Sequence, residues 1–283
     1  MQQTEFQRDA ELPVLKIVPV SSLVVHEYTD QERINGLMQR LEKDNLLKNP
    51  PIVAPIPGST RYVVLDGANR TSALAQAGCR DAAVQVVDYN DPDLELVVWN
   101  HLVAAATPDE VIEPLKHIVG LRMRRVSAEM ARGLLTNRGV LASVTRVDGQ
   151  VIVLEGGLTL DQEAELLNQI VWSYHGRKRY FRVKSDEMKC LLPYYDGAAA
   201  LFCYPCFRPD EITHLASIGA RLPAGITRHV IPQRALRINI PLHILKQDRP
   251  LEEKNDWLHE KIKRHLVNRE IRFYQEPTVL FDE

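Results

Sequence analysis

Along the first hundred residues, short apolar runs alternate with stretches of helical periodicity. Runs rich in β-branched residues predict four strands. These runs lie at 15–25, 52–56, 61–65 and 81–89. Apolar residues at helical spacing predict a helix over 31–45, behind the N-cap residue Asp30, and another over 69–77, which ends at Gly78. The order strand, helix, strand, strand, helix, strand predicts a small α/β unit.

The rest of the chain continues as a mixture of helices and strands. The segment LELVVWNHLVAA, at 94–105, predicts a helix that carries Trp99. Further helices are expected at 108–119, 127–136, 160–174 and 251–269. A hairpin is expected around 147–150, and a strand, a turn and a strand within 226–245. We find no internal repeat and no clear flexible linker, and we expect a domain boundary near residue 105.

Composition narrows the class of protein only slightly. The chain has 283 residues, of which 45% are hydrophobic and 25% charged, so it has enough apolar surface for a packed core. A net charge of −2 gives no global argument for binding nucleic acid or an anionic membrane. No apolar run approaches the roughly 18 residues of a membrane-spanning helix, and the polar N-terminus does not read as a signal peptide. Four cysteines are too few for a disulfide scaffold, so a cytoplasmic protein is expected.

One turn has the chemistry of an anion site. In VVLDGANRTSALAQAG, a strand stops at Asp66, Gly67 follows, and a helix opens with polar side chains. The N–H groups and the dipole of a helix N-terminus attract anions. Glycine lets a phosphate approach the backbone, an arginine such as Arg70 forks onto phosphate oxygens, and Asp66 is suited to Mg²⁺. An ordinary strand-to-helix turn, with Asp66 as a cap and Arg70 in solvent, remains the alternative.

This turn resembles the Asp-Gly-x-His-Arg segment of the ParB/sulfiredoxin-like superfamily. Four further segments resemble the free L-serine kinases of that superfamily, including those of siderophore gene clusters. They are HEYTD at 26–30, Trp99, PAGITRHVIP at 223–232, and LRINIPLHILKQD at 236–248 with the closing helix. The similarity runs from about residue 14 to the end, and the middle, about 105–220, matches weakly.

The resemblance implies an α+β fold. A ParB/sulfiredoxin-like α/β nucleotide-binding domain at 14–105 would pack against a second α/β domain at 106–283 that completes the substrate site. The implied activity is transfer of the terminal phosphate of ATP, or of ADP, to free L-serine with Mg²⁺. The product would be O-phospho-L-serine, with a siderophore or diaminopropionate role implied only by the resemblance.

The same resemblance assigns roles to residues of this sequence. Glu27 would be the general base, and Asp66 the second acid and the metal ligand. Nucleotide binding falls to Gly67, Ala68, Asn69, Arg70, Thr71, Ser72, Lys48 and Asn49. Serine binding falls to Trp99, Thr227, Arg228, His229 and His26. Asn69 stands where the family has histidine, and asparagine can donate to a phosphate but cannot carry a positive charge.

Other interpretations start from residues outside this pattern. The basic, aromatic run GRKRYFRVK at 176–184 is typical of a nucleic-acid groove or of a charged edge strand. The first option would suit a nucleotide-responsive, ParB-like DNA-binding transcriptional regulator. Such a protein usually adds a helix-turn-helix, but 120–125 reads as extended chain between the two helices expected in 108–136. Nucleic acid and membrane partners are therefore not expected, and no oligomeric state is predicted.

The cysteines suggest no site of their own. Sulfiredoxin-like chemistry needs a cysteine beside the phosphate turn, and Cys79 lies at the far end of the helix instead. The pair CYPC at 203–206 lacks the second ligand pair of a structural zinc site, so buried thiols are expected.

Overall fold

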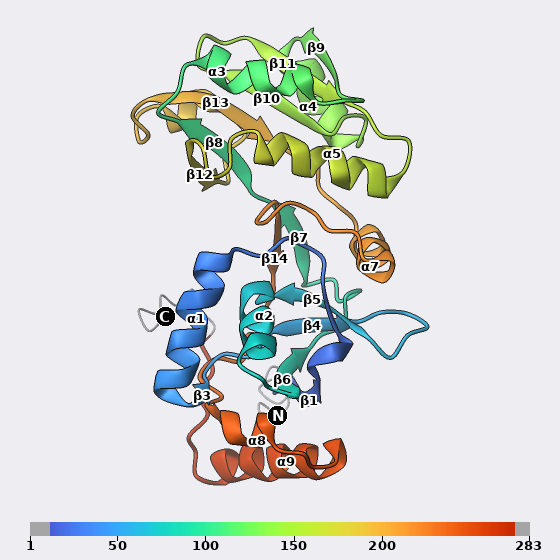
Figure 1. Cartoon of the computed structure of the whole chain (residues 1–283), viewed down its shortest axis with the longest axis vertical. Helices are drawn as coiled ribbons and strands as arrows, with labels where there is room; N and C mark the ends of the chain where they lie inside the picture. The colour runs from blue at the N-terminus through green and yellow to red at the C-terminus, as the bar shows by residue number, and fades with distance from the viewer. Residues whose placement is uncertain (1–11, 275–283) are drawn as a thin grey trace, which may run out of the picture.

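The structure is a computed structural model that describes residues 12–274, and it has two lobes stacked along its long axis (Figure 1). The lower lobe holds a five-stranded sheet in the order β1-β6-β4-β5-β2. Its strands are β1 (Val14–Pro19), β2 (Leu23–Val25), β4 (Ile52–Pro55), β5 (Tyr62–Asp66) and β6 (Asp81–Val86). Helices α1 (Gln31–Asp44) and α2 (Ala68–Gln76) connect them, so the predicted α/β unit is confirmed.

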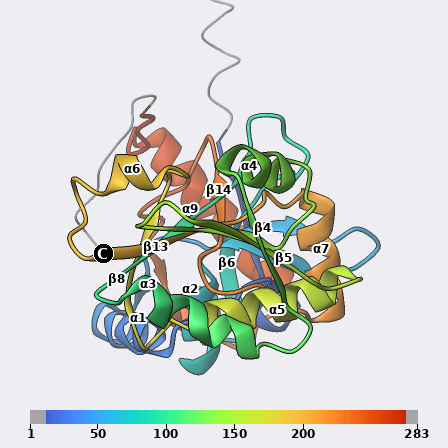
Figure 2. The same cartoon turned by 90° about the horizontal axis from the view of Figure 1, so that it is seen from above.

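The upper lobe holds a six-stranded antiparallel sheet in the order β12-β8-β13-β10-β11-β9. Its strands are β8 (Asn100–Ala104), β9 (Arg122–Val126), β10 (Ala142–Arg146), β11 (Val151–Glu155), β12 (Arg179–Val183) and β13 (Ala198–Cys203). Its helices are α3 (Pro108–Ile112), α4 (Ala128–Thr136), α5 (Leu160–Trp172) and α6 (Met188–Leu191). Seen along the long axis, this sheet overlies β4, β5 and β6 (Figure 2).

A two-stranded ribbon connects the lobes. Strand β7 (Glu95–Val98) pairs antiparallel with β14 (Thr227–Val230), and β7 leads directly into β8. The helix predicted over 94–105 is therefore wrong. All of β8 is buried, and a short run that is apolar on both faces has the same pattern in a buried strand as in a buried helix. Trp99 lies between β7 and β8 rather than on a helix.

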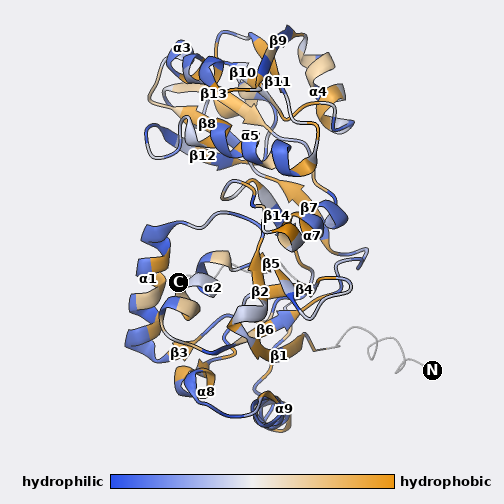
Figure 3. Cartoon of the chain, turned by 45° about the vertical axis from the view of Figure 1, so that its right-hand side comes forward, coloured by the Kyte–Doolittle hydropathy of each residue, from blue (hydrophilic) through white to orange (hydrophobic). Residues whose placement is uncertain are grey.

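Successive side chains of a strand point to opposite faces of the sheet, and both faces of the lower sheet are covered by other parts of the chain. Along β5, Val63 and Leu65 belong to the buried cluster that continues into the upper lobe. Val64 belongs to a second cluster with α1 and α2. Coloured by hydropathy, the sheet strands are largely apolar, whereas the outer sides of α1 and α9 are polar (Figure 3).

The end of the chain returns to the lower lobe. Helix α7 (Pro209–Ile218) contributes Ile212 and Leu215 to the cluster that contains Val63. After β15 (Ile240–Pro241), which pairs with β3 (Leu46–Leu47), helices α8 (Leu242–Lys246) and α9 (Leu251–Val267) pack in the cluster of Val64. A buried ion pair between Lys254 of α9 and Asp81 of β6 joins α9 to the lower sheet. The domain boundary near residue 105 stays a prediction. The residues before 105 and the residues after 105 both contribute to both lobes.

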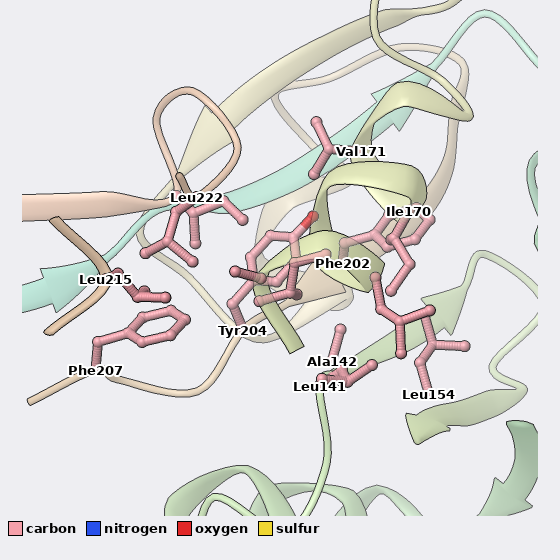
Figure 4. Packing of buried hydrophobic residues seen from close by; sticks show 14 of the residues in the cluster. Leu141, Ala142, Leu154, Ile170, Val171, Phe202, Tyr204, Phe207, Leu215 and Leu222 are labelled. Carbon is pink, nitrogen blue, oxygen red and sulfur yellow. The ribbon is translucent and has the colours of Figure 1, made fainter. Parts of the chain in front are cut away.

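The upper core forms where α5 lies over β10, β11 and β13 (Figure 4). Phe202, Tyr204 and Ile170 meet there, and all three are at most 3% exposed. Helices α3 and α4 are separated by β9, so they do not form a helix-turn-helix. The run GRKRYFRVK includes β12, which pairs with β8 alone, as a charged edge strand does.

Two remaining expectations concern cysteines and membranes. Of the CYPC pair, Cys203 is buried as predicted, whereas Cys206 is exposed, so the prediction of buried thiols is wrong for Cys206. Within residues 12–274, no helix is both long and apolar enough to cross a membrane.

Candidate functional site

Two carboxylates lie just beyond the last paired residues of the parallel strands β2 and β5. Val25 of β2 pairs with Val64 of β5, and Glu27 and Asp66 each follow two residues later. Neighbouring strands lie about 4.8 Å apart, so the sheet brings both acids to the same edge. Glu27 also forms a bridge with Leu222, which attaches it to the segment that leads into β14.

The carboxylate of Glu27 is held from three sides. Gly225 N–H donates to Oε2 at 2.9 Å, Thr227 N–H donates to Oε1 at 2.9 Å, and the Thr227 hydroxyl donates to the same Oε1. A carboxylate has about four acceptor positions, so one position, on Oε2, is left for a substrate hydroxyl. The group is thereby fixed in orientation and still able to accept a proton.

In the cradle that Gly225 and Thr227 form for Glu27, the left-handed backbone at position 225 favours glycine. Its φ is +73°, and a Cβ there would lie 2.0 Å from Cζ of Arg182. The Arg182 guanidinium also donates to the Ala224 carbonyl at 3.4 Å. The cradle of Glu27 therefore rests on an arginine of the upper lobe.

His26 connects the same cradle to β5. Its Nδ1 lies 2.8 Å from the Val64 carbonyl, which can only accept, so Nδ1 carries the proton. Burial lowers the pKa of His26, and the ring is neutral at pH 7. Nε2 is then an acceptor 2.9 Å from Thr227 Oγ1, so Glu27 and His26 compete for one hydroxyl proton. Thr227 thus links the expected base to the histidine beside it.

His229 is a second buried, neutral histidine. Its Nε2 lies 2.8 Å from Tyr89 Oη, and its ring meets that of His26 edge-on at 5.4 Å between centroids. Burial lowers the pKa of His229 to about 3, so this ring carries no positive charge near neutral pH. Without a ligand, His229 offers no positive charge to a carboxylate at pH 7, and its contacts with Tyr89 and His26 attach β14 to the lower lobe.

Arg228 points to the opposite side of the ribbon from its two neighbours. Alternation along β14 places Thr227 and His229 together, and Arg228 on the other face. There its guanidinium lies 4.6 Å from the ring centroid of Trp99, a stacking geometry that holds an arginine in place. The structure thus brings Glu27, His26 and Thr227 into contact, and separately Trp99 and Arg228.

The first turn of α2 is open to an anion. Gly67 is its N-cap, with φ of +90°, and no side chain caps the helix. A Cβ at Gly67 would lie 3.0 Å from Arg70 Nη1 and 3.2 Å from the Pro51 Cα, so glycine keeps this approach open. Thr71 Oγ1 is buried and has no hydrogen-bond partner. Buried polar groups are normally satisfied, so a ligand oxygen is a fitting partner.

Two neighbouring side chains of this turn are already oriented. Asn69 Oδ1 accepts from Asp30 N–H at 2.9 Å, which joins α2 to the start of α1 and leaves the Asn69 amide as a donor. Arg70 Nη1 donates to the Pro50 carbonyl at 3.0 Å. Ala68 and Ser72 belong to the same first turn and are partly exposed.

A small pocket extends from this turn toward α1 and β3. Its apolar wall comes from four leucines, Leu37, Leu41, Leu46 and Leu47. Arg40, Asp44, Lys48, Asn49 and Arg70 supply the polar part. Lys48 pairs with Asp44 at 2.7 Å, and Asn49 Oδ1 accepts from Arg237 N–H at 2.9 Å. An apolar wall beside convergent polar groups is the usual composition of a ligand site.

Asp66 lies beside the open helix end and forms an ion pair with Arg234. Mg²⁺ binds through one or two carboxylates when phosphates and waters complete its shell. Among the described residues, no group of three or more His, Cys, Asp or Glu could hold a metal without such help. The donor set therefore fits a metal that arrives with a nucleotide.

Several of these contacts were not predicted from the sequence. Gly225, Tyr89 and Arg234 all reach the site from segments distant in sequence. Gly225 lies inside the PAGITRHVIP segment, whereas the other two carry no local signal.

The architecture is shared with a known enzyme structure. A free serine kinase solved in complex with ADP superposes with a TM-score of 0.71 at 17% identity, over 83% of this chain and 95% of that one. This likeness defines the fold as that of the free serine kinases. No protein-family model matches the chain.

Curated relatives then identify the family. An ATP-dependent L-serine kinase of Desulfurococcus mucosus is 34% identical over 83% of this chain and 91% of its own length. The ATP-dependent L-serine kinase SbnI of Staphylococcus aureus is 24% identical over 95% of this chain. An ADP-dependent L-serine kinase of Thermococcus kodakarensis is also 24% identical, over 83% of it. The chain belongs to the L-serine kinase family.

Proposed function

We propose that this protein phosphorylates free L-serine with ATP or ADP to give O-phospho-L-serine. The observation that carries the proposal is the position of Glu27. Its carboxylate is fixed by Gly225 and Thr227, retains one acceptor position, and follows the end of a strand whose parallel neighbour ends in Asp66. The names of the relatives supply the substrate class.

In this proposal the nucleotide lies across α2 and the leucine-lined pocket. The phosphates meet the N–H groups and side chains of the first turn, and the base and sugar lie toward Lys48 and Asn49. The turn residues with this role are Gly67, Ala68, Asn69, Arg70, Thr71 and Ser72. Asp66 would hold Mg²⁺, which supplies neutralising charge to the phosphate oxygens when bound.

The serine then lies between this turn and β14. Glu27 accepts the proton of the serine hydroxyl as that oxygen bonds to the terminal phosphorus. The bond from this phosphorus to its bridging oxygen breaks, and ADP leaves when ATP is the donor. Thr227 and His26 orient Glu27, and Arg228, held against Trp99, is the candidate for the serine carboxylate.

The test is direct detection of the product. Purified protein is incubated with L-serine, Mg²⁺ and either ATP or ADP, and O-phosphoserine is followed by ³¹P NMR, with D-serine as the matched control. We expect product from L-serine with at least one nucleotide and none from D-serine. Absence of product with both nucleotides, in protein shown to bind them, would refute the proposal. A siderophore role and a cytoplasmic location remain predictions.

A further inference from the structure

A loop between β14 and β15 lies along the phosphate end of the lower lobe. This loop, residues 231–239, is called the strap below. It begins directly after β14, whose Thr227 binds the Glu27 carboxylate, and it ends where β15 pairs with β3, beside Lys48. Near its middle, the Arg234 guanidinium forms the ion pair with Asp66. Asp66 directly precedes Gly67, the N-cap of α2, so the ion pair places this guanidinium close to the open start of the helix.

A buried glutamine fixes the strap on both sides of Arg234. Gln85 of β6 is 2% exposed, and its amide makes two hydrogen bonds to the strap backbone. Nε2 donates to the Gln233 carbonyl at 2.6 Å, and Oε1 accepts from Ala235 N–H at 2.8 Å. The two residues held are the neighbours of Arg234, so the direction of this one side chain is determined by the sheet beneath it.

The strap is held again further along. Arg237 N–H donates to Asn49 Oδ1 at 2.9 Å, and Asn49 lines the leucine pocket. Arg237 and Asn239 both have positive φ, at +54° and +48°. Residues with side chains adopt this conformation only where their surroundings impose it. The strap is therefore shaped by contacts on the nucleotide side of the lobe.

The positive charge of Arg234 makes the strap suitable for contact with a phosphate. Negative charge spreads over the oxygens of a phosphoryl group in transfer, and an arginine is suited to it. In the first turn of α2, Arg70 is the cationic side chain, and its Nη1 is bonded to the Pro50 carbonyl. The Arg234 side chain is 40% exposed and that of Asp66 is 36% exposed. An ion pair this exposed contributes little stability, so a phosphate can replace the Asp66 carboxylate as the partner of Arg234.

We propose that Arg234 binds the terminal phosphate of the nucleotide, held in position by Gln85, and that its ion pair with Asp66 is the nucleotide-free arrangement. The proposal rests on the proposed function, because the phosphate in question is the one transferred to serine. It makes Arg234 a catalytic residue and Gln85 a positioning residue. The terminal phosphate then replaces the Asp66 carboxylate as the partner of Arg234, and Asp66, freed of its ion pair, would be able to hold the metal that accompanies the nucleotide.

The experiment compares ATP with AMP, which lacks the terminal phosphates. Dissociation constants of both are measured by calorimetry, in EDTA and in Mg²⁺, for wild type, Arg234→Ala, Arg234→Lys and Gln85→Met. Arg249→Ala, at an exposed arginine between α8 and α9, is the matched control. Melting temperatures show that each variant is folded.

We expect Arg234→Ala to weaken ATP binding at least tenfold in EDTA while AMP binding changes less than twofold. Arg234→Lys should recover part of the loss, Gln85→Met should show a smaller loss of the same kind, and Arg249→Ala should match wild type. Equal affinity of Arg234→Ala and wild type for ATP would overturn the proposal, as would an equal loss for ATP and AMP. Either result would make Arg234 only a surface partner of Asp66.

The binding comparison separates this proposal from the proposed function. A wild type that makes no O-phosphoserine, but whose preference for ATP over AMP depends on Arg234, would refute the kinase activity and support the phosphate contact. A wild type that phosphorylates serine, with an Arg234→Ala variant of unchanged ATP affinity and unchanged kcat, would do the reverse. In the expected case, kcat of Arg234→Ala falls by about 10³-fold.

Discussion

At the scale of single residues, one hydroxyl connects the chemistry of the site. Thr227 donates to Glu27 and lies 2.9 Å from the unprotonated nitrogen of His26. The hydroxyl has a single proton, and its position decides how strongly the Glu27 oxygen is held. The neutral ring of His26, fixed by the Val64 carbonyl, is the competing acceptor. A small side chain thus helps to fix the orientation of Glu27, the proposed base.

We predict that Thr227→Val lowers kcat for O-phosphoserine formation by about 10- to 100-fold. A hydrogen bond to a charged group is worth about 1.5–3 kcal/mol, and valine keeps the shape and the backbone N–H donor. Thr227→Ser should retain most of the activity. Initial rates and melting temperatures measure both effects, and a fully active valine variant would show that the hydroxyl does not position Glu27.

At the scale of elements, the open start of α2 is the feature on which the proposed nucleotide binding depends. Its N-cap is a glycine with positive φ, and its C′ residue, Gly78, has a positive φ of 75° as well. The two glycines differ in their surroundings. A Cβ at Gly67 meets Arg70 and Pro51, whereas one at Gly78 meets nothing within 4 Å.

This difference makes a matched pair of substitutions. Gly67→Ala and Gly78→Ala should each cost about 1–2 kcal/mol of unfolding free energy, because both force alanine into left-handed backbone. Only Gly67→Ala should weaken ATP binding, by about tenfold or more, because only it narrows the helix start. Chemical unfolding and calorimetry provide the two measurements. Equal ATP affinities for the two variants would argue against a phosphate site at this turn.

The elements also show how far the sequence alone could lead. Helix α1 begins after Asp30 and α2 stops before Gly78, as predicted, because caps act locally. The segment 94–105 was misassigned because it is apolar on both faces, where helix and strand patterns coincide. Glu27 and Asp66 were predicted from local segments. Their partners Gly225 and Arg234 lie 198 and 168 positions away, and no local pattern reports such contacts.

At the scale of the whole molecule, buried histidines gather where β14 and its cradle meet both lobes. His26 and His229 lie on the lower side. His101 lies on the upper side, where Nδ1 is 2.7 Å from Tyr174 Oη and Nε2 is 3.3 Å from the Gly225 carbonyl. Burial lowers the pKa of His101 to about 4 and that of His229 to about 3. In the folded protein these histidines therefore stay unprotonated at pH values where the same histidines of the unfolded chain bind protons.

This arrangement predicts acid sensitivity. Unfolded histidines titrate near 6.5, so the stabilisation is complete above that pH and is lost as pH falls toward 4 and 3. Between pH 7.5 and 5, we expect a loss of about 2 kcal/mol of unfolding free energy for each of these two histidines. Urea unfolding at pH 7.5 and 5.0 measures it. His101→Gln should reduce the pH dependence, whereas His259→Gln, at an exposed position on α9, should not. Equal pH dependence in wild type and His101→Gln would contradict this assignment.

The most direct test of the account as a whole is phosphate transfer by Glu27→Gln, compared with wild type and with Glu42→Gln, a change of an exposed glutamate on α1. O-phosphoserine is quantified by mass spectrometry, and ATP affinity and melting temperature are measured on the same preparations. Glutamine keeps the size of the side chain and, with its oxygen toward Thr227, can accept two of the three hydrogen bonds, but its NH2 group would face the Gly225 N–H and cannot take the serine proton. We predict that Glu27→Gln binds ATP as wild type does and loses at least about 10²-fold in kcat, while Glu42→Gln keeps full activity. A Glu27→Gln enzyme with unimpaired turnover would contradict the central claim that this carboxylate is the base.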